Sequence, residues 1–285
     1  MEQHSLDVAQ GERFEFGENW KLFLEQLNPE RIHRAEESLK RMLGVESLEG
    51  KTFLDIGSGS GLFSLAARQL RAKVHSFDYD PHSVSCTSEL KRRYYSQDPY
   101  WVVEEGSALD VNYLRTLGTF DIVYSWGVLH HTGAMWRALE NAAPLVANNG
   151  RLFIAIYNDQ GRPSVMWLKV KQAYNRLPKG ARWLVVIPAM VRLWGPSMVR
   201  DVFRGKPFNT WKNYINQGSA RGMDPWRDAV DWIGGLPIVV AKPEAVFDFF
   251  RNRDFSLDKL RTCRGGLGCN EFVFTKTGSS KQIKE

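Results

Sequence analysis

The chain has 285 residues, 43% of them hydrophobic, and a net charge of +6, which suffices for one full α/β core with an added lobe. It contains no run of eighteen apolar residues, which argues against a transmembrane helix, and its polar first twelve residues lack the pattern of a signal peptide. Three cysteines without the spacing of a zinc or redox site suit a reducing compartment, so we expect a cytoplasmic protein.

The first helical pattern runs from Glu18 to Leu43. Its apolar residues Trp20, Phe23, Leu24 and Leu27 recur at helical spacing. We therefore predict one or two amphipathic helices here, and we expect residues 1–50 to form a helical cover.

A glycine turn follows a short strand pattern. Residues 53–56 predict a buried strand in which Asp55 interrupts the apolar run, and glycines follow at positions 57, 59 and 61. A helix pattern then begins at Leu62, so the turn opens backbone N–H groups to a ligand at a helix N-terminus. A dinucleotide-binding fingerprint needs a small residue at position 62. That residue is Leu here, so the sequence excludes this type of site.

Strand and helix patterns alternate from residue 51 to residue 156. After the glycine turn, strands are predicted at 73–77, 100–104, 120–125 and 151–156. The first of these ends at Asp78, where a carboxylate can accept hydrogen bonds from both hydroxyls of a ribose. A helix over 243–253 and strands over 255–263 and 270–276 complete the pattern. The sequence thus predicts a doubly wound, seven-stranded, mostly parallel α/β sheet, with the last strand antiparallel.

In order and spacing these motifs resemble the class I S-adenosylmethionine (SAM)-dependent methyltransferase family. Asp55 and the three glycines resemble its motif I, and the segment 121–131, which ends in Val128-Leu129-His130-His131, resembles motif IV of its small-molecule, quinone-biosynthesis branch. The resemblance covers residues 50–157 and, more loosely, 240–276. It implies a Rossmann-like methyltransferase fold, SAM as the cofactor, and a leading helix that either covers the cofactor or packs on the surface.

The resemblance also implies a set of cofactor contacts at the strand ends. They are Asp55, Gly57, Ser58, Gly59, Gly61, Asp78, Tyr79, Ser107, Ala108 and Trp126. Asp78 would hold the ribose and Tyr79 would pack on the adenine. Ser107 stands where the family usually has Asp, so the contact to the adenine amino group lacks a charge. For Asp55, a role as helix cap is the alternative.

The acceptor side is predicted to use the ends of the fourth and fifth strands. His131, and after it His130, is the candidate general base, the alternative being one packed and one solvated ring. Tyr157 and Asn158 are predicted to orient the acceptor. We expect no metal site, because no third ligand lies at a useful spacing from the histidines.

An insertion between the fifth and sixth strands carries the basic character of the chain. Residues 158–235 hold thirteen Lys or Arg and five Asp, a net charge of +8, and six of the ten tryptophans. Segment 183–194 is apolar up to Arg192, has Trp at both ends and is too short to span a bilayer. Such a helical lobe either caps an apolar acceptor, touches a membrane surface, or simply has an apolar core and a basic wet face; RNA binding fits less well.

The predicted organisation has five parts. They are a cover (1–50), a SAM-binding core (51–157), a helical insertion (158–240), the last helix and strands (241–277) and a polar tail (278–285). The predicted function is methyl transfer to an O or N atom, or to S or C, of a small or lipid-like acceptor. The alternatives are an RNA methyltransferase, an enzyme that transfers another group from SAM, and a SAM-binding subunit without activity. The oligomeric state stays open.

Overall fold

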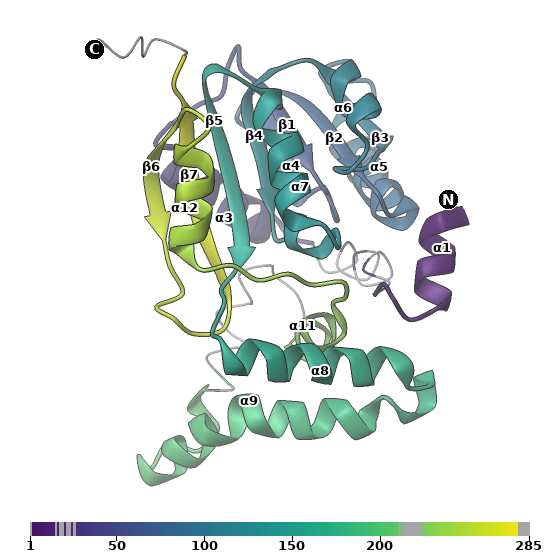
Figure 1. Cartoon of the computed structure of the whole chain (residues 1–285). Coiled ribbons are helices and arrows are strands. Elements are labelled where there is room, and N and C mark those ends of the chain that lie inside the picture. Colours follow the sequence, from purple (N-terminus) through teal and green to yellow (C-terminus); the bar gives the residue numbers. More distant parts are fainter. Residues whose placement is uncertain are drawn as a thin grey trace. The chain divides into compact units, whose positions relative to one another are not determined.

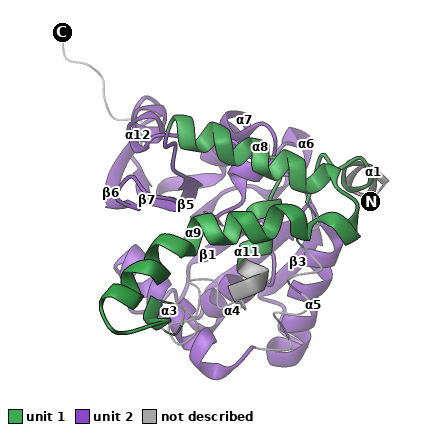
Figure 2. Cartoon of the chain, turned by 90° about the horizontal axis from the view of Figure 1, so that it is seen from below, with its two compact units in different colours: residues 1–19, 161–237 green, residues 20–160, 238–285 purple. Residues whose placement is uncertain are grey.

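The computed structural model describes residues 2–14, 16, 20, 24, 27–210, 212 and 225–278. The chain forms two compact units (Figure 2), a sheet unit of residues 20–160 and 238–285 and a helical unit of residues 1–19 and 161–237. This division differs from the predicted one, since residues 1–19 group with the insertion instead of belonging to a separate cover.

The sheet unit is built on seven strands in the order β3-β2-β1-β4-β5-β7-β6 (Figure 1). Their bounds are β1 Thr52–Ile56, β2 Lys73–Asp78, β3 Trp101–Glu105, β4 Phe120–Trp126, β5 Val146–Tyr157, β6 Phe255–Arg261 and β7 Cys269–Lys276. Strands β1 to β5 pair in parallel, and β7 is antiparallel to both β5 and β6. The predicted doubly wound sheet is confirmed.

Helices cover both faces of the sheet, with α3 on one face and α7 and α12 on the other (Figure 1). The helices of this unit are α3 Pro29–Leu43, α4 Leu62–Gln69, α5 Pro81–Tyr95, α6 Val111–Leu117, α7 Met135–Ala142 and α12 Pro243–Arg251, with short 3₁₀ turns η1 Leu129–His131 and η2 Ala143–Leu145. Helix α3 begins where Asn28 Oδ1 accepts the N–H of Arg31 at 3.0 Å. Of the predicted 18–43 helix, residues 18, 19, 21–23, 25 and 26 lie outside the described part of the chain.

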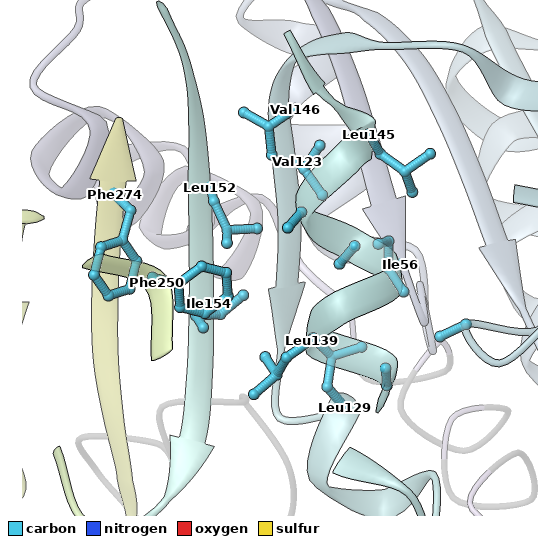
Figure 3. Close-up of a cluster of buried hydrophobic side chains, with 14 of the residues drawn as sticks. Ile56, Val123, Leu129, Leu139, Leu145, Val146, Leu152, Ile154, Phe250 and Phe274 are labelled. Carbon is cyan, nitrogen blue, oxygen red and sulfur yellow. The ribbon is translucent and has the colours of Figure 1, made fainter. Parts of the chain in front are cut away.

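The main core lies between the sheet and helices α6, α7 and α12 (Figure 3). Alternate residues of β5 and β7, such as Leu152, Ile154 and Phe274, point to this face and are fully buried. Phe250 from α12 packs against Phe274 with ring centroids 4.8 Å apart. Burying each such side chain contributes about 1.5–3 kcal/mol to the stability of the fold, so this face helps to hold the strands of the sheet in register.

The helical unit combines the insertion with the start of the chain. Its described elements are α1 Glu2–Ala9, α8 Arg162–Arg176, the 3₁₀ turn η3 Lys179–Ala181, α9 Trp183–Phe203 and α11 Pro225–Gly234. Phe14 joins the lobe core, because its N–H donates to the carbonyl of Leu236 at 3.0 Å and its ring occupies the space beside Gly234. The predicted helical character of the insertion is thus confirmed for its described residues. None of the helices in the described part of the chain is long and apolar enough to cross a bilayer.

Candidate cofactor and acceptor site

The glycine turn connects β1 to α4 and is closely packed from both sides. Gly57 has φ +77°, and a Cβ there would lie 2.3 Å from the side chain of Val128. Gly59 has φ +56°, and a Cβ there would lie 3.1 Å from the indole of Trp20. Both positions combine a left-handed backbone with a close neighbour, so only glycine fits without strain. Gly57 thereby places the loop that follows β4 directly against the turn.

Asp78 at the end of β2 holds the glycine turn to the strand. The N–H of Gly59 donates to its Oδ2 and the N–H of Asp80 to its Oδ1, both at 2.9 Å. The N–H of Tyr79 bonds to this carboxylate as well, and a carboxylate has roughly four acceptor sites, so acceptor capacity remains for a ribose. Burial raises the pKa of Asp78 to about 6, against the effect of these N–H groups. The residues present therefore fit a nucleoside at this strand end.

Asp55 lies beneath the turn, within the sheet unit. It is 2% exposed and accepts a hydrogen bond from Ser64 Oγ at 2.5 Å. Burial raises its pKa to about 7, with the Ser64 hydrogen bond lowering it and the charge of Asp78 raising it. The helix cap considered for Asp55 is wrong, because α4 has Gly61 at its N-cap and no side-chain cap bond. Asp55 instead anchors α4 to the strand below the turn.

A chain of buried hydroxyls extends this anchor. Ser64 Oγ lies 2.8 Å from Ser76 Oγ, which accepts the Nε1–H of Trp101 at 2.9 Å. Because the one hydroxyl proton of Ser64 is donated to Asp55, the hydroxyl of Ser76 donates to Ser64 while it accepts from Trp101. The network therefore ties β1, β2, β3 and α4 together under the glycine turn.

The predicted adenine contacts lie at the same sheet edge. Tyr79 is half-buried directly after β2, and the register pairs Asp78 with Glu105, two residues before Ser107. Ser107 is half-buried, and its Oγ accepts the N–H of Leu109 at 3.2 Å. Ala108, which is 8% exposed, belongs to the main core.

Trp126 ends β4 at the same edge of the sheet. Its Nε1–H donates to Glu271 Oε1 of β7 at 3.3 Å, and both residues flank Ala155 in the register. This bond fixes the indole at the carboxyl end of the parallel strands, where ligands bind in open α/β sheets.

Three rings gather where β4 and β5 end. The centroid of the His130 ring lies 4.4 Å from that of His131 and 4.3 Å from that of Tyr157. The rings of His131 and Tyr157 meet edge to face at 5.6 Å. His130 is fully buried and His131 is 8% exposed, so His131 is the more accessible of the pair. Val128 precedes the two histidines in the same loop and contacts Gly57. The ring cluster therefore lies close to the glycine turn.

Asn158 is committed to the link between β6 and β7. Its Oδ1 accepts from Asn270 Nδ2 at 3.0 Å, its Nδ2 donates to the carbonyl of Gly266 at 3.2 Å, and its N–H donates to that of Gly268 at 2.9 Å. Both ends of the Asn158 amide have partners, and the residue is only 8% exposed. These contacts favour a structural role for Asn158 over the predicted role of orienting an acceptor.

Two residues outside the sequence motifs, Thr87 and Trp20, also contact the glycine turn. Thr87 Oγ1 lies 2.9 Å from Ser58 Oγ and donates to the carbonyl of Gly59 at 3.3 Å, which fixes the turn to α5. Thr87 lies inside a helix, and no local pattern distinguishes it. The apolar helical pattern predicts that Trp20 is buried, but only the fold shows that its indole lies beside Gly59. Among the described residues no cluster of His, Cys, Asp or Glu could hold a metal ion.

Comparisons with known proteins agree with this arrangement. The methyltransferase-domain family profile matches residues 26–194, more than half of the chain. Ubiquinone biosynthesis O-methyltransferases from Methylocella silvestris and Coxiella burnetii are 28% and 25% identical in alignments of length 176 and 183, which cover 53% and 61% of this chain. The matches span 63% and 70% of those relatives, so the first is covered over less than two thirds of its length.

A solved structure shares the fold. Magnesium protoporphyrin IX methyltransferase from Synechocystis PCC 6803, solved with bound S-adenosylhomocysteine (SAH), is 12% identical with a TM-score of 0.50, over 86% of this chain and 84% of that one. At this identity the likeness concerns the fold alone. Since the profile match spans more than half of the sequence, and the sheet has the topology that the motifs predicted, the chain belongs to the class I SAM-dependent methyltransferase family.

Proposed function

We propose that this protein transfers a methyl group from SAM to a hydroxyl oxygen of a small, lipid-like acceptor. The observation that carries the proposal is the cluster of His130 and His131, on the loop that packs against Gly57, with Tyr157 at the end of β5. The names of the relatives, all O-methyltransferases of ubiquinone biosynthesis, favour oxygen as the acceptor atom.

The residues at the strand ends divide the work of holding the cofactor. Asp78 accepts the ribose hydroxyls, Gly59 leaves room for close approach, and Tyr79 with Ser107 and Ala108 forms the adenine side. Asp55 contributes by holding α4 and the turn in place. Bound SAM supplies a methyl group on a sulfonium, which is already a strong electrophile.

The acceptor side supplies orientation and a base. Alignment of an acceptor oxygen with the methyl group lowers the barrier by about 7–11 kcal/mol in well-oriented systems. His131 would take the proton of the acceptor hydroxyl as that oxygen receives the methyl group, which contributes about 10²–10⁴-fold. His130 and Tyr157 hold the imidazole of His131 by ring contacts.

The proposal is tested with acceptors that differ only in the receiving atom. The purified full chain is incubated with SAM and matched phenols, anilines and thiophenols, and both SAH and the methylated product are measured. We expect SAH and methyl ether in equal amounts with the phenol series. Methylation of the nitrogen or sulfur series alone would refute oxygen as the acceptor.

Gly59→Ala is expected to weaken SAM binding by at least about tenfold, because the added methyl group occupies space at the turn. Gly44→Ala is the matched control, since Gly44 also has a left-handed backbone, with φ +64°, and nothing within 4 Å of an added Cβ. Both variants carry similar backbone strain, and the contact with the Trp20 indole should lower the unfolding temperature of Gly59→Ala further. Calorimetry on the folded variants compares their SAM affinities. Equal SAM affinity in the two variants would reduce Gly59 to an ordinary turn residue.

SAM affinity is expected to fall as the pH drops below about 6, the pKa to which burial raises Asp78. The ionised carboxylate accepts the ribose hydroxyls, and protonation at lower pH turns one oxygen into a donor. Titration calorimetry across this range should show the loss for the wild type and a flat profile for Asp78→Asn. A pH dependence that survives in the variant would assign it to another group.

A further inference from the structure

Helix α9 is apolar on two opposite faces. Its inner face packs in the core of the helical unit, where Val186 is 3% and Ala189 6% exposed. Its outer face carries large apolar side chains that are about half exposed or more, namely Leu184 at 52%, Ile187 at 48%, Val191 at 64%, Val199 at 56% and Val202 at 63%. At 3.6 residues per turn these five fall on one side of the helix, and we call them the α9 stripe.

Aromatic residues mark both ends of the stripe. Trp183, the first residue of α9, is 56% exposed; Phe203, its last residue, is 88% exposed, and Phe208 beyond it is 60% exposed. The outer face of a surface helix normally carries charged and polar groups. A continuous apolar face of this length on a folded lobe marks a site of contact with a partner.

The charge around the stripe has one sign. Lys179, Arg182, Arg192, Arg200, Arg204 and Lys206 flank or follow it. The acidic residue of this segment, Asp201, is 4% exposed, and its carboxylate accepts the N–H of Thr210 at 2.5 Å. Between residues 179 and 206, all of them described, no exposed acid offsets the cations.

From this pattern we infer that the α9 stripe docks on the surface of an anionic lipid bilayer. A bilayer offers both an apolar layer for the aliphatic side chains and phosphate headgroups for the flanking cations. Aromatic residues at the ends of the apolar face suit the headgroup level. The helix lies in the interface and does not span it, in keeping with the finding that none of the described helices can cross a membrane.

Other occupants fit the stripe less well. A two-fold contact with a second copy of the chain brings the same surface against itself and sets arginines against arginines. RNA is recognised by stacking aromatics and hydrogen-bonding groups, whereas the stripe is aliphatic along its length. The inference does not depend on the proposed methyl transfer, although a lipid-like acceptor is found in the same bilayer.

The structure also determines which substitution tests this surface. Val186 belongs to the same apolar run but is buried in the lobe core, so an Asp there would damage folding. Val191 is 64% exposed on the stripe and accepts an Asp without a core defect. Val111, 37% exposed at the start of α6 in the sheet unit, is the matched control.

The experiment is co-sedimentation of the full chain with vesicles of phosphatidylcholine, with and without phosphatidylglycerol. We expect binding to the anionic vesicles that weakens with salt, falls about tenfold or more in Val191→Asp and is unchanged in Val111→Asp. Arg192→Gln with Arg200→Gln should weaken binding to the anionic vesicles alone. Circular dichroism and unchanged SAM affinity verify that each variant is folded.

Three outcomes would overturn the inference. The first is equal vesicle binding by wild type and Val191→Asp. The second is a dimer in analytical ultracentrifugation that Val191→Asp dissociates, without vesicle binding, which would identify a second copy as the partner. The third is binding to single-stranded RNA that depends on Val191.

Discussion

Replacement of His131 by Gln is expected to slow methyl transfer by about 10²–10⁴-fold while SAM affinity stays unchanged. Gln keeps the polar character and much of the volume of His but cannot take a proton. The deficit should shrink for acceptors with more acidic hydroxyl groups, because these need less help in losing the proton. Single-turnover rates with a series of substituted phenols measure this directly.

Tyr157→Phe and Tyr157→Ala serve as the controls for this cluster. Phe keeps the ring that contacts His130 at 4.3 Å and His131 at 5.6 Å, so it should retain most of the rate if Tyr157 acts by packing. Ala removes the ring and should lower the rate. A His131→Gln variant as fast as the wild type, with every acceptor, would exclude His131 as the base.

Asp78→Ala is expected to weaken SAM binding by about 1–3 kcal/mol, or roughly 5–150-fold. The change removes the acceptor for two ribose hydroxyls and also frees the N–H of Gly59, which now donates to Oδ2. The SAM affinity of Asp78→Asn should lie between those of the wild type and Asp78→Ala, because its amide keeps one acceptor oxygen. Isothermal titration with SAM and with SAH gives the affinities.

Asp110→Ala is the matched control for Asp78. Asp110 is an exposed carboxylate that accepts the N–H groups of Asn112 and Tyr113 at the start of α6. Its loss should cost about 1 kcal/mol of stability as a missing helix cap, without weakening SAM binding. If Asp78→Ala, verified as folded, bound SAM as tightly as Asp110→Ala, Asp78 would not be the ribose ligand.

Most of the sheet was predictable because its signals are local. Apolar runs such as 53–56 and 151–156 belong to strands buried on both faces, and Pro at the first turn of α12 marks its start. The start of β5 differed: the segment Asn148-Asn149-Gly150 indicates a turn, yet β5 begins at Val146. Asn149 has φ +59°, a conformation that Asn tolerates, so the strand passes through it.

The site was predictable as a set of positions but not as a set of contacts. Motif spacing predicts Gly57, Gly59 and Asp78 as cofactor contacts, whereas the structural role of Asn158 follows from partners more than a hundred residues away. The grouping of residues 1–19 with the insertion depends on Phe14 meeting Gly234, which no local pattern encodes. Helical periodicity separates the two faces of α9, but only packing shows which face is buried.

The central claim, methyl transfer to a small lipid-like hydroxyl, is tested most directly with SAM that carries a deuterated methyl group. The purified full chain and this SAM, at a limiting concentration, are incubated with a cellular lipid extract, and all products are analysed by mass spectrometry, with Asp78→Ala as the control for weakened SAM binding. We predict a small-molecule product that carries one deuterated methyl group on oxygen and forms in smaller amount with the variant. Label found in RNA instead, or SAM bound without any transfer, would contradict the account.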